Sequence, residues 1–286
     1  MRIGMSNHRS PVLESRADYI LPGSVTLVPM NRRSFVQSVA GAGLLSQTAA
    51  AQPSAIPTRL YCLDYFYYRQ GDQAGRLQQF LSSQMPLWTK HSHVFGVFTA
   101  VMAPHAQTTL VLSGFSGFEE MTAAENRLEA DQGFQKARQE LERGNDPAFY
   151  SRQRVLLRAT DFSPEIVPLA EKPQRPRYFE IRVYHSPTAR QLRLVHERFA
   201  GPEIRIFHRS GIHPILYGDT IAGPDMENLT YITPFASLGD REKAWDTFGA
   251  DPEWIKVREE SIVKGGQIVD YQNLSIWRAA PFSPIQ

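Results

Sequence analysis

The hydrophobic and polar positions of the chain follow the same plan twice. In the second round, residues 178–184 (YFEIRVY) alternate between apolar and polar side chains, as is typical of a strand with two different faces. Leu192, Val195 and Phe199 lie at helical spacing and predict a helix that ends near Gly201-Pro202, and a second short helix is predicted at 203–208. Two strands, two helices and a last strand at 268–277 complete this round. The order indicates an α+β fold.

The first round has a similar order with different lengths. It predicts a strand at 60–67, a helix with its apolar face at 77–88, strands at 94–102 and 109–115, one long helix at 119–142 and a closing strand at 155–157.

Repeated sequence supports a tandem duplication. Residues 157–164 (LRATDFSP) match 277–284 (WRAAPFSP) at an offset of 120, and residues 93–104 and 213–224 both run from His to Pro at that offset. Asp146-Pro147 in the first round corresponds to Asp251-Pro252 in the second. We therefore expect two related domains, at 58–161 and 177–286, joined by a proline-rich linker at 162–176.

The second round carries a combination of short motifs and single residues. They are Glu180-x-Arg182-x-Tyr184, His208, Tyr217, Gly223, Asn228-Leu229, Ser237-Leu238-x-x-Arg241 and Asp251-Pro252-Glu253-Trp254. In this combination the second round resembles the NIPSNAP family, a branch of the dimeric α/β-barrel (ferredoxin-like) superfamily. The chain departs from the usual family pattern in having Pro187-Thr188 in place of a Gly after the first strand and Tyr231 in place of a Trp in the third strand.

The resemblance and the duplication together imply tandem ferredoxin-like domains with antiparallel sheets, packed as a fused barrel. The first domain would be a degenerate NIPSNAP-like copy. Barrel relatives bind small molecules in the interior, so we expect the polar faces of the first strands to point inward. An interaction between Asp64 and Arg182 near the pseudo-twofold axis follows from that orientation.

These considerations give a set of candidate pocket residues that could orient a polar ligand or move protons. The alternative is a satisfied polar network between two sheets. The candidates are Asp64, Glu180, Arg182, Tyr184, His208 and Tyr217.

Known catalytic and metal-binding patterns are absent from the sequence. It contains no nucleophile elbow, P-loop, GxGxxG, HExxH or CxxC motif. His91, His93 and His213 have no recognised ligand spacing and are interpreted as structural, so we expect no metal site. Neither a catalytic residue nor a cofactor can be named from the sequence.

The N-terminal residues contain an export pattern. Residues 31–36 (NRRSFV), with Arg32-Arg33, resemble a twin-arginine motif, and a Gly- and Ala-rich run and Ala49-Ala50-Ala51 follow. We therefore expect residues 1–51 to be a disordered N-terminus and signal peptide, cleaved near Ala51, and the mature protein to be periplasmic or secreted. Met30 is an alternative start to Met1.

Charge and composition narrow the class of protein. The chain has 42% hydrophobic and 21% charged residues and a net charge of +2. Residues 1–51 hold five arginines and two acidic residues, so the rest has 26 basic and 27 acidic residues. A net charge of −1 gives no support to nucleic-acid binding. Cys62 is the only cysteine, so no disulfide forms within the chain, and no apolar run is long enough to span a membrane.

Three functions stay open at this point. The first is a small-molecule or protein-binding module that uses the barrel interior. The second is an enzyme of monooxygenase or isomerase type acting on a small organic or haem-like ligand. The third is a structural partner in an envelope complex, as a homo-oligomer or with another protein.

Overall fold

The structure is a computed structural model of the chain, and it describes residues 56–286. The twin-arginine motif and the predicted cleavage site lie outside these residues. No helix between residues 56 and 286 is long and apolar enough to cross a membrane.

The first half of the described chain comprises four strands and three helices. They are β1 (Leu60–Tyr67), α1 (Gln73–His91), β2 (Val94–Met102), β3 (Thr108–Phe115), α2 (Phe118–Ala130), α3 (Gln132–Leu141) and β4 (Ser151–Ala159).

The second half repeats this order with additional helical turns. It consists of β5 (Tyr178–His185), α4 (Ala189–Arg198), a kinked segment (Phe199–Glu203), α5 (Ile204–Arg209), β6 (Leu216–Ala222), β7 (Asn228–Phe235), α6 (Leu238–Gly249), α7 (Pro252–Gly265) and β8 (Tyr271–Ala279).

The eight strands form one closed antiparallel barrel in the order β1-β3-β2-β8-β5-β7-β6-β4. Within each half the central strand pairs with two neighbours, β1 with β3 and β4, and β5 with β7 and β8. The halves join where β2 pairs with β8 and β4 pairs with β6. This confirms the predicted α+β fold of tandem ferredoxin-like units with antiparallel sheets.

The barrel interior is an apolar core built from both halves. Tyr61 and Leu63 of β1 and Phe179 and Ile181 of β5 belong to one buried cluster together with Trp277 of β8. Apolar side chains of this kind fill much of the interior of a small barrel. The predicted orientation is therefore wrong: the apolar face of each first strand points into the barrel.

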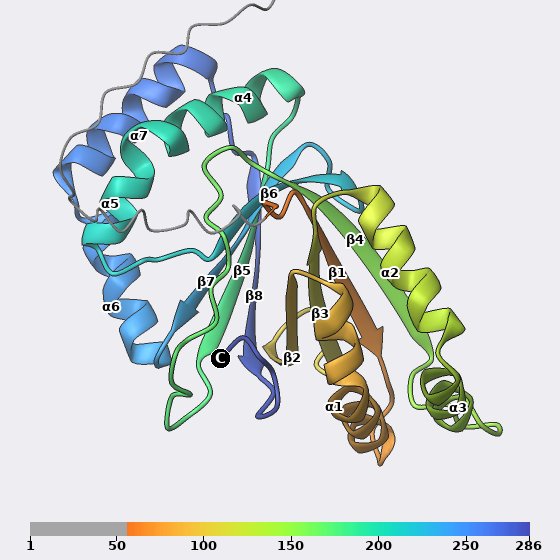
Figure 1. Cartoon of the computed structure of the whole chain (residues 1–286). Coiled ribbons are helices and arrows are strands. Elements are labelled where there is room, and N and C mark those ends of the chain that lie inside the picture. Colours follow the sequence, from red (N-terminus) through yellow and green to blue (C-terminus); the bar gives the residue numbers. More distant parts are fainter. Residues whose placement is uncertain (1–55) are drawn as a thin grey trace, which may run out of the picture. The chain divides into compact units, whose positions relative to one another are not determined.

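The helices cover the outside of the barrel, α1–α3 over the first half and α4–α7 over the second (Figure 1). The predicted long helix at 119–142 is divided in two at Asp131, whose backbone is extended. The Asp131 carboxylate accepts a hydrogen bond from the Phe134 amide at 2.8 Å and caps α3. The chain turns there, and α3 packs against both α1 and α2.

The tail of each half is fixed to the other half by equivalent contacts. The Val97 amide on β2 donates to Ser283 Oγ at 3.0 Å, and the Tyr217 amide on β6 donates to Ser163 Oγ at 3.0 Å. Ser163 and Ser283 belong to the repeated FSP sequence. The repeat thus has a structural role, because it ties the end of each half to a strand of its partner.

Candidate functional site

A cavity of about 410 Å³ lies between the outer face of the first-half sheet and helices α1–α3. We call it the first-half cavity. Its walls are largely aromatic, with rings from the strands, the helices and the loop before β4. These rings belong to Phe66, Phe80, Trp88, Phe95, Phe115, Phe134 and Phe149.

The aromatic wall is packed into a fixed arrangement around Trp88. The Trp88 ring stacks on Phe95 with a centroid distance of 5.4 Å, and it meets Phe80 and Phe134 edge-on at 5.7 and 5.4 Å. Offset stacking and edge-to-face contacts are the favoured geometries of aromatic pairs. The wall is therefore preformed, and the residue that brings Phe134 to it is the cap at Asp131.

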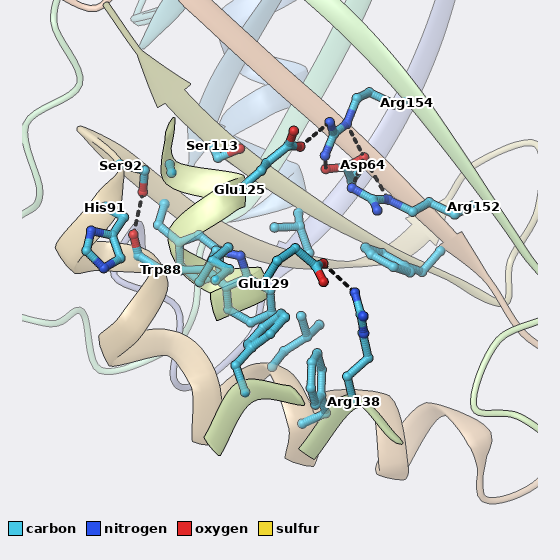
Figure 2. Close-up of a pocket in the computed structure, with 18 of the residues that line it drawn as sticks. Asp64, Trp88, His91, Ser92, Ser113, Glu125, Glu129, Arg138, Arg152 and Arg154 are labelled. Carbon is cyan, nitrogen blue, oxygen red and sulfur yellow. Dashed lines mark hydrogen bonds and ion pairs between the residues drawn. The ribbon is translucent and has the colours of Figure 1, made fainter. Parts of the chain in front are cut away.

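The sheet side of the cavity carries a cluster of ion pairs (Figure 2). The Asp64 side chain is only 7% exposed and accepts hydrogen bonds from Arg152 Nε at 3.0 Å and from Arg154 Nε and Nη2 at 2.9 and 3.0 Å. Arg154 also pairs with Glu125 of α2. Strand register explains the cluster, because Arg154 lies directly across from Asp64 and Arg152 is two residues away on the same face.

The opposite end of the cavity holds His91 and Ser92, well away from the Asp64 cluster (Figure 2). Ser92 Oγ donates to the Trp88 carbonyl at 2.9 Å. Desolvation and the nearby Lys90 and Arg127 lower the pKa of His91, which favours a neutral imidazole near pH 7. His91 is thus a base available to a molecule in the cavity.

The predicted pocket residues divide between the two outer faces of the barrel. Asp64 lines the first-half cavity, whereas Arg182 and Tyr184 line a separate cavity in the second half. The predicted Asp64–Arg182 interaction is wrong. Asp64 pairs with the arginines of β4, and Arg182 pairs with Glu180, because the two strands turn these side chains toward different sets of helices.

The other predicted residues line neither of these two cavities. Glu180 is buried and bonded to Arg182, Arg241 and the Trp245 indole. Tyr217 is buried in the second-half helical core, and His208 is exposed with its ring stacked on His213 at 5.2 Å. Glu180 therefore belongs to a hydrogen-bonded polar network, which was the alternative to a ligand pocket in the sequence analysis.

Several site residues were not predicted from the sequence. Arg152 and Arg154 follow an Arg-x-Arg spacing that places both on one face of β4, the signal that could have found them. Glu125 and Arg138 carry no comparable pattern, since charged residues on helices usually face solvent.

The barrel itself contains a third cavity of about 300 Å³, lined by Tyr65, Tyr67 and Trp277 among others. The polar groups around it bond mainly to each other. Tyr67 donates to Gln153 at 2.9 Å, and Tyr271 and Asn273 donate to Asp225 at 3.0 and 2.7 Å. Between residues 56 and 286 no group of three or more His, Cys, Asp or Glu side chains is placed to hold a metal ion.

Comparison with known proteins identifies the second half. Residues 179–284 match the model of the NIPSNAP family. The second half is a NIPSNAP domain. A NIPSNAP family protein of unknown function from Agrobacterium tumefaciens is 21% identical, with 40% of this chain and 97% of that chain covered and a TM-score of 0.35. No curated protein matches the chain.

Both halves together share their fold with a further solved structure. A candidate monooxygenase from Fusobacterium nucleatum superimposes with a TM-score of 0.51 at 8% identity, with 79% of this chain and 94% of that chain covered. Another from Lactobacillus acidophilus has a TM-score of 0.49 at 13% identity, with 78% and 94% covered. The NIPSNAP domain thus forms one half of a barrel whose whole architecture is shared with the Fusobacterium protein.

The ion-pair cluster makes a prediction about stability. Asp64→Asn would remove the buried carboxylate that Arg152 and Arg154 share and leave Arg154 with Glu125 alone, and we expect the free energy of unfolding to fall by about 2 to 4 kcal/mol. That is near the lower end for a broken buried pair, because both arginines keep access to water. Asp72→Asn, in an exposed pair with Arg76, should cost at most about 1 kcal/mol. Urea denaturation measures both, and equal costs would contradict the assignment.

Proposed function

We propose that the chain is a binding protein for a small, neutral, largely aromatic molecule, held in the first-half cavity. The observation that supports this most directly is the preformed aromatic wall beside a fully compensated ion-pair cluster. The volume of about 410 Å³ lies within the range of roughly 300 to 1,000 Å³ of small-molecule sites. Rings that are already ordered cost little further entropy when a flat ligand stacks on them.

The charges around the cavity favour a neutral ligand. Arg152 and Arg154 are engaged by Asp64, Arg154 by Glu125, and Arg138 by Glu129. A charged ligand would have to break one of these pairs, and leaving a partly buried carboxylate without its partner is costly. A hydroxyl or carbonyl group on the ligand can instead share Arg152, whose side chain is 44% exposed.

This site replaces the barrel interior as the place of binding. The interior cavity is smaller, and its polar groups already satisfy each other. The outer cavity combines an aromatic wall, a charged cluster and a neutral imidazole in one space.

An enzyme of monooxygenase type is the second candidate. It is favoured by His91 at the cavity and by the fold shared with a candidate monooxygenase. For a phenolic aromatic, dioxygen supplies one oxygen atom to the ring and the other leaves as water, so that a naphthol yields a naphthoquinone without a further reductant. His91 would accept the phenolic proton.

Export is the third part of the proposal. It rests on the order of Arg32-Arg33, the weakly apolar run and the alanines at 49–51. The first-half cavity would then bind its ligand outside the cytoplasm.

The binding proposal predicts that filling the first-half cavity weakens ligand binding. Leu128→Trp on α2 places a large ring in the cavity, and the neutral fluorescent probe N-phenyl-1-naphthylamine should bind at least about tenfold more weakly, a loss of about 1.4 kcal/mol. Phe248→Trp on α6, at the corresponding position of the second half, is the matched control and should bind the probe like the wild type. Absence of probe binding to the wild type, or equal affinities of both variants, would refute the proposal.

The enzyme proposal predicts oxygen consumption. With 1-naphthol as the probe, an oxygen electrode should record one dioxygen consumed per naphthol. His91→Asn should slow this by at least about 100-fold, as expected for loss of a general base, while naphthol affinity stays unchanged. No uptake by the wild type argues against this activity and leaves the binding proposal intact.

The export proposal predicts processing. In cell fractionation, the wild type should be recovered outside the cytoplasm with its N-terminus just after Ala51, as read by mass spectrometry. Replacement of Arg32 and Arg33 by lysine should leave the unprocessed protein in the cytoplasm. A wild-type protein that keeps residues 31–51 would contradict export by this route.

A further inference from the structure

The NIPSNAP domain has an outer cavity of its own, with a volume of about 370 Å³. We call it the second-half cavity. It lies against β5 and is bordered by α4, α6 and α7. Arginines approach it from three elements, Arg182 from β5, Arg198 from α4 and Arg258 from α7. No Asp or Glu is among its lining residues in the described part of the chain.

We propose that the second-half cavity binds a small organic oxyanion, a carboxylate or phosphate joined to an apolar group. Guanidinium groups match both oxyanions because their N–H donors form a planar fork. The apolar part of the ligand would contact the rings of Tyr184 and Phe248 and the side chain of Ile268, which also line the cavity.

Positive charge exceeds negative charge around this cavity. Arg182 shares the buried Glu180 with Arg241, and Arg198 pairs with the fully buried Glu203 at 2.7 Å. Arg258 has no ion pair and donates no side-chain hydrogen bond within residues 56–286. Four arginines are thus opposed by two carboxylates, and a ligand anion would compensate the excess.

Two of the guanidinium groups are already fixed in position. Arg182 lies over the Trp245 ring at 3.5 Å from its centroid and donates to Gln272 Oε1 at 3.2 Å. Arg198 lies near the Trp254 ring at 5.2 Å and donates to Ser261 Oγ at 3.4 Å. Cation–π contacts and the buried carboxylates restrict these side chains, so an anion pays less entropy to order them.

The buried carboxylate of Glu203 is a positioning group for this site. It lies at the end of the kinked segment Phe199–Glu203, where Gly201 departs from helical geometry between α4 and α5. Its Oε2 accepts from Arg198 Nε, while Oε1 has no hydrogen-bond partner among the described residues. The buried Glu203 carboxylate thereby holds the Arg198 guanidinium beside the cavity.

The two outer cavities differ at an equivalent position. Asp64 and Arg182 hold the same place on the central strands of the two halves, and Phe66 corresponds to Tyr184. In the first-half cavity, Asp64 and Glu125 compensate Arg152 and Arg154. In the second-half cavity, Arg182 shares Glu180 with Arg241, and Arg258 has no ion pair among the described residues, so positive charge remains. The two cavities therefore select different ligand classes.

Isothermal titration with benzoate and phenyl phosphate tests the proposal, with benzyl alcohol as the neutral control. We expect saturable binding of at least one anion to the wild type, weakened by added salt, and no saturable binding of the alcohol. Arg258→Gln should lower the affinity about tenfold, and it should fold because Arg258 is exposed. Lys256→Gln removes the same charge from α7 outside the cavity and should bind like the wild type.

Three results would overturn the proposal: no saturable binding of either anion, equal affinity for benzyl alcohol, or equal affinities of the Arg258→Gln and Lys256→Gln variants. Leu128→Trp separates this site from the first-half cavity, since it should leave anion binding unchanged. Loss of anion binding in that variant would place the anion in the first-half cavity and also overturn the proposal.

Discussion

Closure of the barrel is the constraint on which the rest of the structure depends. The backbone hydrogen bonds of β2 with β8 and of β4 with β6 join the halves. Without them each sheet would have two open edges and an uncovered apolar face, a form that invites aggregation. Closure satisfies the strand edges and buries apolar residues of both halves in one core. The charged residues of the central strands, Asp64 on β1 and Glu180 and Arg182 on β5, then point outward, toward the helices.

The outward polar residues are kept there by charge compensation. Asp64 has two arginines from the neighbouring strand, and Glu180 has one arginine from its own strand and one from α6. Buried charges of this kind are tolerated only when they are paired and hydrogen-bonded. The first-half cavity lies beside Asp64 and the second-half cavity beside Arg182, and aromatic side chains of the helices line the remaining space. The two outer cavities thus lie where charged side chains of the sheet meet the helices.

Much of the fold can be predicted from the sequence, and the site can be predicted less well. The strands Leu60–Tyr67 and Val94–Met102 match their predicted ranges because alternation and turn residues define them locally. The direction of each face could not be predicted, since both faces of β1 and β5 are largely covered and alternation shows only that they differ. Arg152 and Arg154 were missed because β4 was identified from its apolar residues alone. The two arginines contact Asp64 because of the register between β1 and β4. That register depends on how the two strands pair and cannot be read from the sequence of either strand alone.

The segment at the end of each half bonds to a strand of the other half, and this bears on how the two cavities came to differ. Ser163 and Ser283 show that each half completes the other, as two identical subunits would. In a barrel made from two copies of one gene, every substitution appears twice, so both clefts must change together. Fusion removes that restraint, because a codon at position 64 can change while the codon at 182 does not. A single covalent chain with an acid at one site and a base at the other is something that a symmetric pair cannot encode.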